Sequence, residues 1–282
     1  MPSKSKLIAV TGGSGRAGRA VVQHLYDAGY RILNLDRNPP PSPLPARFVP
    51  TDLTNYGQVV DMLEEVDSVV HFAAIPAPLS APPSEIFHNN TASTYNIFQA
   101  ARLHGVKRIV WASSETCFGL PFDNVKPYKA PLDEGQPPSP ESAYALSKIL
   151  GEEMARQFNR WSGIPIIGLR LSNVMEQKNY VNFQSWQHDP KIRAVNMWGY
   201  IDARDVGRAV ECALTCEFQG ADFFTIAAAD TVMHAPNDEL MAAAYPDVPY
   251  TPTPGPNDSL YDISKARNVL GFIPQYSWRN EV

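Results

Sequence analysis

The stretch LIAVTGGSGRAGRAVVQHLYDAG, which covers residues 7–29, decides the fold of this chain. It starts with residues 7–10, a short apolar run typical of a buried parallel strand. The glycine-rich turn TGGSGRAG follows at residues 11–18, and an amphipathic segment continues to Gly29, a residue type that commonly ends a helix. A strand, a glycine turn and a helix in this order predict a nucleotide-binding turn, because bare backbone N–H groups at a helix N-terminus attract phosphate.

Apolar runs and amphipathic segments alternate along most of the remaining chain. Further strands are expected at residues 31–36, 47–49, 68–73, 108–113, 165–171 and 222–227. Further helices are expected at residues 57–65, 85–104, 141–162, 203–215, 237–244 and 263–270. This alternation predicts an α/β fold, a Rossmann-type doubly wound parallel sheet with a small C-terminal substrate-binding part. We expect the Rossmann domain to cover residues 1–170 and the substrate-binding region to cover residues 171–282, with residues 200–230 returning to the main sheet.

The overall composition narrows the class of protein. Hydrophobic residues make up 44% and charged residues 19% of the 282 residues, as in ordinary globular proteins. The net charge is 24 − 29 = −5 and no basic stripe occurs, which argues against nucleic acid and anionic membranes as partners. No apolar run approaches the ~18 residues of a membrane span, and the one near the N-terminus is too short for a signal peptide.

The three cysteines form no disulfide framework, which agrees with a reducing cytoplasm. Cys212 and Cys216 lie four residues apart on an expected helix. No further His or Cys stands near them in the sequence, so we interpret them as small buried residues and expect no metal.

Proline is the compositional outlier, with 26 in 282 residues against a usual share of about 5%. Fifteen of them fall in residues 39–45, 76–83 and 121–140, which follow the second, fourth and fifth expected strands. The carboxyl ends of parallel strands form the ligand-binding edge of such a sheet. Because proline restricts the backbone, we interpret these segments as a stiff rim around a site, chiefly at residues 121–140.

The glycine turn has the spacing G-x-x-G-x-x-G, which lets a pyrophosphate approach the backbone closely. Its expected cofactor-binding residues are Gly12, Ser14, Gly15, Arg16, Ala17 and Gly18. Asp36 ends the second expected strand, where a carboxylate accepts hydrogen bonds from both ribose hydroxyls and repels a 2′-phosphate. This favours NAD over NADP as the cofactor.

Three charged residues leave alternatives open. Arg16 and Arg37 would each accommodate a 2′-phosphate, so NADP remains a less favoured choice, but we favour solvated surface charges for both. Asp52 follows the third strand, where it would meet the adenine beside Leu53 or else cap the next helix.

Tyr144 and Lys148 form a Y-x-x-x-K motif on the helix expected at residues 141–162, and so share one helix face. To act as a base, the tyrosine needs its pKa lowered from about 10 to about 7, which an ammonium group and a positive nicotinamide ring would supply. Ser113 and Ser114 end the fifth expected strand, at the same edge of the sheet.

The chain resembles the NAD-dependent epimerase/dehydratase family, in the extended branch of the short-chain dehydrogenase/reductase superfamily. The matching pieces, in the family's order, are TGGSGRAG at 11–18, Asp36, HFAA at 71–74, NNTASTYN at 89–96, WASSETCFG at 111–119, YALSK at 144–148, LRLSNV at 169–174, YIDARDV at 200–206 and DISKARNVLGF at 262–272. The resemblance implies that Tyr144 is the general acid/base and that Lys148 holds the nicotinamide ribose. Ser114, five residues before Gly119, would supply the catalytic hydroxyl.

Further roles are implied by the same resemblance. Asn90 would position a water or the lysine, and Ala73 and Ala74 would pass close to the cofactor ribose. Ser172 and Asn173 would lie beside the nicotinamide and the substrate, or else cap the end of their strand. The full set expected to bind substrate is Ser113, Ser114, Glu115, Tyr144, Ser172 and Asn173.

Family members that act on nucleotide-linked sugars carry a long insert after the LRxxNV strand. Here only 26 residues separate Asn173 from Tyr200, which favours a small substrate. Aromatic side chains in residues 175–199 would either stack on a sugar or form a local hydrophobic core; they are Tyr180, Phe183, Trp186, His188 and Trp198.

In size the chain resembles the uronate dehydrogenases, which oxidise free hexuronates. They place an arginine after the sixth strand to hold the sugar carboxylate, but this chain has none between Arg170 and Arg193. Lys178 or Arg193 would have to replace it, and a neutral free sugar fits equally well.

We therefore expect an NAD-dependent oxidoreductase that takes a hydride from a small sugar-like alcohol, with Tyr144 as the general base. The alternatives are a sugar or nucleotide-sugar epimerase or dehydratase and a non-catalytic NAD(H)-sensing regulator. By resemblance, a homodimer would form through the helices at residues 85–104 and 141–162. Within the first of these, four residues would either face the partner subunit or pack on the sheet, namely Ile86, Ile97, Phe98 and Ala101.

Overall fold

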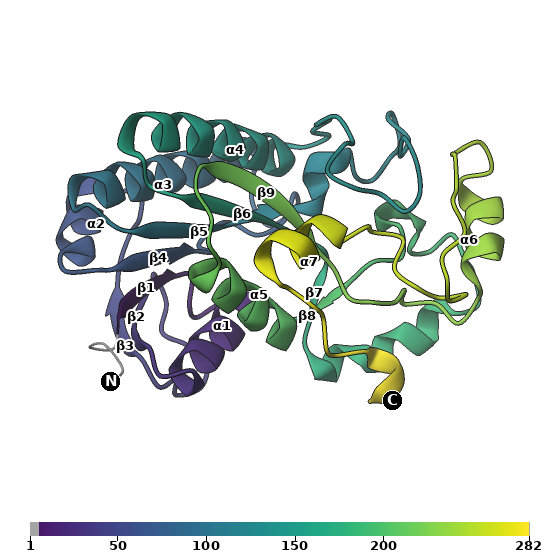
Figure 1. Ribbon diagram of the computed structural model, residues 1–282, viewed down its shortest axis with the longest axis horizontal. Coiled ribbons are helices and arrows are strands. Elements are labelled where there is room, and N and C mark those ends of the chain that lie inside the picture. Colours follow the sequence, from purple (N-terminus) through teal and green to yellow (C-terminus); the bar gives the residue numbers. More distant parts are fainter. Residues whose placement is uncertain (1–5, 282) are drawn as a thin grey trace.

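In a computed structural model, the structure describes residues 6–281, so the outer ends of the two expected domains, residues 1–5 and 282, lie outside it. A seven-stranded parallel sheet runs through the molecule in the order β3-β2-β1-β4-β5-β6-β9, with helices on both faces (Figure 1). Its strands are β1 (Leu7–Thr11), β2 (Arg31–Asp36), β3 (Arg47–Pro50), β4 (Ser68–His71), β5 (Arg108–Ser114), β6 (Ile166–Leu171) and β9 (Ala221–Ile226). Its helices are α1 (Arg16–Asp27), α2 (Tyr56–Leu63), α3 (Pro83–Leu103), α4 (Ala143–Ser162), α5 (Ala203–Thr215), α6 (Asn237–Ala244) and α7 (Ser264–Leu270). The predicted α/β class with a Rossmann-like sheet is confirmed.

Every expected strand and helix has a counterpart, mostly within two or three residues. The expected strand at residues 68–73 is shorter, since β4 ends at His71. A separate two-stranded sheet of β7 (Val174–Met175) and β8 (Ile201–Asp202) was not foreseen. Residues 175–199 fold largely as the 3₁₀ helices η2 (Gln177–Trp186) and η3 (Ala194–Asn196). Such helices have no sustained hydrophobic periodicity, so the sequence did not predict them.

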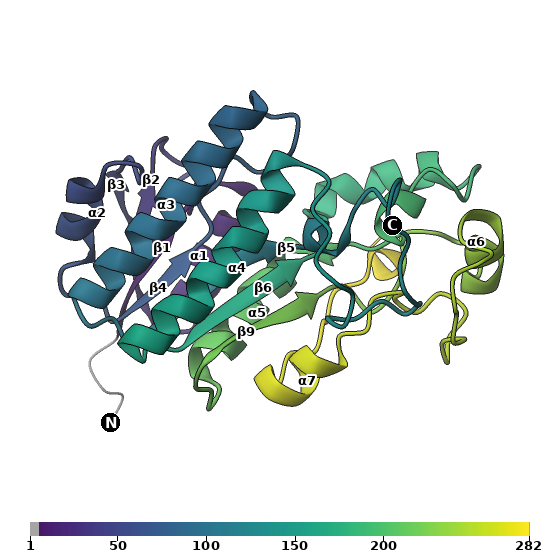
Figure 2. The same ribbon diagram turned by 90° about the horizontal axis from the view of Figure 1, so that it is seen from above.

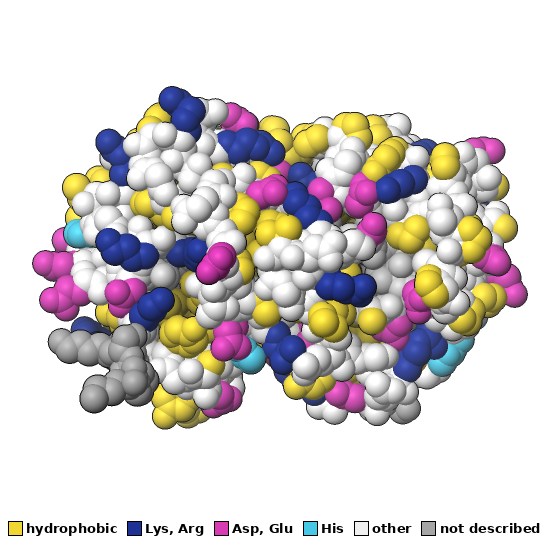
Figure 3. Space-filling view, viewed as in Figure 1, with side chains coloured by type: hydrophobic (Ala, Val, Ile, Leu, Met, Phe, Trp, Pro, Cys, Tyr) yellow, Lys and Arg dark blue, Asp and Glu magenta, His cyan; other side chains and the backbone are white. Residues whose placement is uncertain are grey.

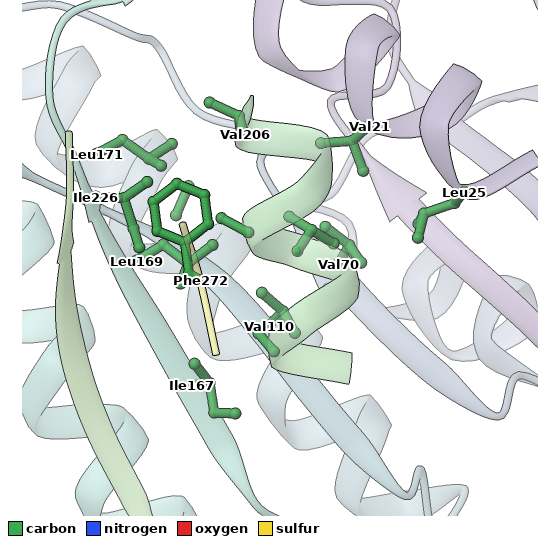
Figure 4. Packing of buried hydrophobic residues seen from close by; sticks show 14 of the residues in the cluster. Val21, Leu25, Val70, Val110, Ile167, Leu169, Leu171, Val206, Ile226 and Phe272 are labelled. Atoms are coloured by element: carbon green, nitrogen blue, oxygen red, sulfur yellow. The ribbon is translucent and has the colours of Figure 1, made fainter. Parts of the chain in front are cut away.

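Two hydrophobic cores cover the two faces of the sheet. On one face, α1, α5 and α7 pack on the strands through aliphatic side chains such as Val21, Val206 and Leu169 (Figure 4). On the other face, α2, α3 and α4 pack through residues that include Ile97, Phe98 and Ala155. Figure 2 shows α3 and α4 lying side by side along this second face.

A third core lies beyond the carboxyl ends of the strands, in the C-terminal part of the chain. It gathers aromatic residues that include Tyr180, Phe183 and Trp198, all fully buried. Two alternatives were expected for the aromatic residues at 175–199, stacking on a sugar or packing in a local core. For these three rings the structure shows packing in a core. β9 returns from this region to the edge of the main sheet beside β6.

The proline-rich segment at residues 121–140 packs into this third core as well. Phe122 and Leu132 are buried there, and the backbone of Leu132 exchanges hydrogen bonds with Leu260 and Asp262. The segment therefore fastens the C-terminal part of the chain, and none of its residues lines the cleft described below. By contrast, Pro39, Pro76 and Pro78 from the other two segments do line it.

One buried ion pair fixes α4 to the sheet. Arg170 on β6 donates from Nε and Nη2 to the two carboxylate oxygens of Glu152 on α4, both at 2.8 Å. Ser113 on β5 donates to the same carboxylate at 2.7 Å. Since α4 also carries Tyr144 and Lys148, this contact sets the place of both expected catalytic side chains.

We expect Glu152→Ala to lower the free energy of unfolding by about 3–5 kcal/mol, because it leaves a buried guanidinium without its partner. The neighbouring Glu153 is the matched control, because its ion pair with Arg156 is exposed to solvent. Urea denaturation should show a clear loss for Glu152→Ala and no measurable loss for Glu153→Ala. Equal losses would contradict the role assigned to the buried pair.

Candidate active site

A cleft of about 860 Å³ opens at the carboxyl ends of the parallel strands. Its walls come from the glycine turn, the loops after β2 and β4, the ends of β5 and β6, and α4. Most of the expected site residues line it, namely Gly12, Ser14, Gly15, Arg16, Ala17, Gly18, Asp36, Arg37, Leu53, Ala73, Ala74, Ser113, Ser114, Glu115, Tyr144, Lys148, Ser172 and Asn173. Asn90 and Asp52 are the expected site residues that do not line it.

The glycine turn leaves no room for a side chain at Gly12 or Gly18. Gly12 has a positive φ of +70°, and a Cβ added there would lie 2.6 Å from the backbone nitrogen of Ala73. A Cβ on Gly18 would lie 2.0 Å from the carbonyl oxygen of Gly12. Helix α1 starts directly after Gly15 with no side-chain cap, so its first N–H groups are available to a ligand. This backbone fits the pyrophosphate of a dinucleotide.

Asp36 lies at the end of β2, beside the glycine turn. Its carboxylate accepts hydrogen bonds from the backbone N–H groups of Ser14, at 3.1 Å, and Asn38, at 3.3 Å. These contacts hold the carboxylate at the cleft wall, where the sequence had predicted a ribose-binding acid.

The two arginines beside the turn are already engaged. Arg37 donates to Asp52 at 3.1 Å and to Asn89 at 2.7 Å, while Arg16 donates to the carbonyl oxygen of Val174 at 2.9 Å. Asp52 also accepts hydrogen bonds from Thr54, which are the main cause of its lowered pKa. The structure thus gives Asp52 a turn-forming role; it neither lines the cleft nor caps α2, whose cap is Asn55.

Ser114, Tyr144 and Lys148 converge on the same part of the cleft. The Lys148 ammonium lies 5.5 Å from the centre of the Tyr144 ring and donates to the carbonyl oxygen of Ala112 at 2.7 Å. Burial lowers the pKa of Lys148 to about 8, because the charged form loses its hydration.

Desolvation also raises the pKa of Tyr144 above its usual value, and a hydrogen bond with Ser114 opposes this rise. The nearby Cys117 and Glu115 raise it further. In the protein without a ligand, the pKa of Tyr144 is therefore raised by burial and not lowered by Lys148 as expected. A positive charge brought close to the phenol would be needed to favour its ionised form.

Ser113 and Asn90 serve the architecture of the cleft. Ser113 is 3% exposed and its hydroxyl donates to Glu152, so its neighbour Ser114 is the better placed of the two serines to meet a ligand in the cleft. The side-chain amide of Asn90 makes two hydrogen bonds to the loop after β4. Its oxygen accepts from the backbone N–H of Ile75 at 2.8 Å, and its nitrogen donates to the backbone carbonyl of Ile75 at 3.1 Å. It thereby holds the part of this loop that lines the cleft.

Glu115 forms the centre of a buried polar cluster beside Ser114. It accepts hydrogen bonds from Ser172 at 2.7 Å, from Tyr261 at 3.0 Å and from Asn196 at 3.4 Å. Burial raises the pKa of Glu115 to about 7, against the effect of these donors and of Arg193. The sequence pointed to Glu115 and Ser172, and to Arg193 as a candidate for binding a sugar carboxylate, but not to Tyr261 or Asn196.

A second buried chain of contacts, also missed from sequence, supports the glycine turn. His71 at the end of β4 lies 2.7 Å from the hydroxyl of Thr11 and 3.2 Å from that of Thr94. Burial, reinforced by Lys148, lowers the pKa of His71 to about 3, so the ring stays neutral. The motif HFAA contained this histidine, but only the fold shows what it contacts.

The fold and the cleft define a dinucleotide-binding protein of the Rossmann type. The chain belongs to the NAD dependent epimerase/dehydratase family, whose sequence model matches residues 8–227. Its relatives include dehydrogenases and epimerases. Together with the family, they indicate an NAD-dependent enzyme of the dehydrogenase or epimerase type.

Three similarities illustrate this. The NAD-dependent glucose-6-phosphate dehydrogenase of Haloferax volcanii is 28% identical over 95% of this chain and 92% of its own. The uronate dehydrogenase of Pseudomonas syringae is 29% identical over 64% of each chain, which is less than two thirds of that enzyme. A UDP-glucose 4-epimerase structure from Thermotoga maritima superposes with a TM-score of 0.74, at 22% identity, over 98% of this chain and 96% of its own.

No helix among residues 6–281 is long and apolar enough to cross a membrane. On the face in Figure 3, acidic and basic side chains are interspersed, and no large patch of one sign appears.

We expect Asn90→Ala to weaken NAD binding roughly tenfold, because two hydrogen bonds that hold the cleft loop at Ile75 are lost. Calorimetric titration with NAD measures this. Thr91→Ala is the control, since the Thr91 hydroxyl bonds only to a backbone carbonyl of its own helix. Unchanged affinity in Asn90→Ala would show that the loop holds its position without the amide.

Proposed function

We propose that the protein is an NAD-dependent oxidoreductase that removes a hydride from a small sugar-like alcohol, either a free sugar or a sugar acid. The observation that carries this proposal is the convergence of Ser114, Tyr144 and Lys148 on the cleft that also contains the glycine turn. Bound NAD⁺ would supply the hydride acceptor at its nicotinamide ring. Tyr144 takes the proton of the substrate hydroxyl, Ser114 donates a hydrogen bond to the same oxygen, and Lys148 orients the ribose and supplies a nearby positive charge.

The packing of the region after β6 supports a small substrate. Tyr180 and Phe183 of η2 and Trp198, which follows η3, are buried in the third core, which supports a site with little space for a nucleotide. The names of two relatives, a glucose-6-phosphate dehydrogenase and a uronate dehydrogenase, support a sugar that carries no nucleotide.

The favoured cofactor is NAD. Asp36 would accept the ribose hydroxyls and repel a 2′-phosphate. Arg37 is paired with Asp52, and Arg16 is bonded to a backbone carbonyl, so neither is free to neutralise that phosphate without breaking a contact.

The alternative is an epimerase, which would retain the ketone and return the hydride. The similarity to UDP-glucose 4-epimerases supports this alternative. Release of NADH into solution distinguishes the two, because an epimerase regenerates NAD⁺ within each turnover. An NAD(H)-sensing regulator is less favoured, since this chain retains every member of the expected catalytic set.

We also propose a homodimer through α3 and α4. The four residues expected either at this interface or on the sheet are fully buried, namely Ile86, Ile97, Phe98 and Ala101. Other side chains form the outer face of the two helices: Tyr95, Leu150 and Trp161 are 48%, 37% and 54% exposed and line an apolar groove of about 310 Å³. Such a patch is typical of a surface that another chain covers. The three cysteines are free, which suits a reducing compartment such as the cytoplasm.

We expect Tyr144→Phe to lower kcat for sugar oxidation about 100-fold or more while NAD still binds, because only the proton-accepting oxygen is removed. NADH absorbance with a panel of free sugars, sugar acids and sugar phosphates provides the assay, run with NAD and with NADP. Epimerisation of UDP-sugars without NADH release from any panel member would rule out the proposed reaction. Full biological activity in Tyr144→Phe would favour the sensor.

For the dimer, we expect light scattering to give twice the 31.2 kDa mass of one chain. Leu150→Glu should reduce this to the monomer mass, because it puts a charge in the apolar groove between α3 and α4. Val269→Glu, at an equally exposed apolar position on α7, should leave the dimer intact. A monomer in the unchanged protein would remove the proposal.

A further inference from the structure

The wall of the cleft next to Ser114 contains a carboxyl group that the proposed hydride transfer does not use. Glu115 is 8% exposed and lines the cleft together with Ser172. Its Oε2 atom already accepts from Ser172 and Tyr261, at 2.7 and 3.0 Å. Its Oε1 atom has a single long contact, at 3.4 Å from the amide of Asn196, and so retains most of its capacity to accept hydrogen bonds.

A guanidinium lies near this carboxyl group without forming an ion pair with it. Arg193 and Glu115 attract each other, yet no ion pair forms between them among residues 6–281. The same arginine stacks on Trp186, 4.8 Å from the ring centre, and its Nε and Nη2 atoms are buried without a hydrogen-bond partner. In Arg170 and in Arg204, the Nε and Nη2 atoms both donate hydrogen bonds to a carboxylate. Arg193 differs from both, because its Nε and Nη2 atoms do not bond to the neighbouring carboxyl group of Glu115.

We propose that Glu115 selects the substrate, accepting a hydrogen bond from a hydroxyl group of a neutral sugar, and that Arg193 is a positioning residue that keeps this carboxyl group ionised. This inference rests on the proposed function and narrows its substrate class. A carboxylate only accepts hydrogen bonds, so it matches a hydroxyl and repels the carboxylate or phosphate of a sugar acid or sugar phosphate at the same position.

The ionisation of Glu115 depends on groups from four parts of the chain. Arg193, from the segment before η3, favours the charged form. Ser172 after β6, Tyr261 from the C-terminal segment and Asn196 from η3 do so through hydrogen bonds. Tyr144 on α4 also faces the cluster, and ionised Glu115 raises its pKa. Burial outweighs the favourable contacts and brings the pKa of Glu115 to about 7, within the range where enzymes are assayed.

The consequence is a pH dependence of opposite sign for two kinds of sugar. Below pH 7 the carboxyl group is protonated and loses its accepting charge, so a neutral sugar binds more weakly. As the pH rises through about 7 the group ionises and the affinity for the neutral sugar increases. A sugar acid placed against the same group should bind more weakly over that rise, because two negative charges then face each other.

The test measures binding, so that it does not depend on turnover. D-glucose, D-galactose and their C6 acids, D-glucuronate and D-galacturonate, are titrated calorimetrically into the NAD⁺-saturated protein between pH 5.5 and 8.5. We expect the affinity for the neutral sugars to rise with an inflection near pH 7, and Glu115→Gln to lower it about 10- to 100-fold at pH 8 and to make the profile flat. Arg193→Met should move the inflection to higher pH, a change that a purely structural role would not produce.

Lys191→Met is the matched control, since it removes an exposed positive charge two residues from Arg193 and should leave the inflection unchanged. Thermal denaturation checks that each variant is folded, and the isosteric Glu115→Gln carries the test should Arg193→Met be unstable. A flat profile in the unchanged protein, an identical profile in Glu115→Gln, or binding of the acids alone overturns the inference, and so does a failure of all four sugars to bind. Binding with the expected profile but without NADH formation would instead reject the proposed reaction and leave the selecting role of Glu115 in place.

Discussion

The close approach of α4 to the sheet is the constraint on which the site depends. Gly151 makes it feasible, because a Cβ there would lie 2.5 Å from the indole ring of Trp111 on β5. The same ring lies 5.3 Å from the Lys148 ammonium, one helical turn away. The buried pair of Glu152 and Arg170 then fixes the helix along its length. Tyr144 and Lys148 thus reach the cleft because a glycine and an ion pair let their helix lie directly on β5 and β6.

Much of the fold could be predicted because it depends on local sequence patterns. The glycine turn, the apolar runs of the buried strands and the spacing of Tyr144 and Lys148 are each contained in a few consecutive residues. The cluster around Glu115 could not be predicted in this way. Tyr261 joins it from 146 residues further along the chain, and Asn196 from 81. No periodicity links residues so far apart, so only the folded chain reveals that they meet.

The aromatic segment shows a second limit of sequence reasoning. A ring that stacks on a sugar and a ring that fills a core are the same residue type in the same polar context, so Tyr180, Phe183 and Trp198 left both interpretations open. Their burial resolves the choice in favour of packing. The proline-rich segment at residues 121–140 followed a strand at the ligand-binding edge, but its Leu132 pairs with the chain around Tyr261. It therefore bears on the site indirectly, by holding the segment that donates to Glu115.

Burial acts on the three titratable groups that lie near Ser114 in the cleft. It lowers the pKa of Lys148 and raises those of Tyr144 and Glu115, so each group is driven toward its neutral form. The two acids also compete, since ionised Glu115 makes ionisation of Tyr144 harder. Arg193 favours the Glu115 anion and thereby maintains the negative charge that opposes ionisation of Tyr144. A cationic ring bound at the tyrosine would favour the phenolate, which gives a physical reason for the proposed base to depend on an oxidised dinucleotide.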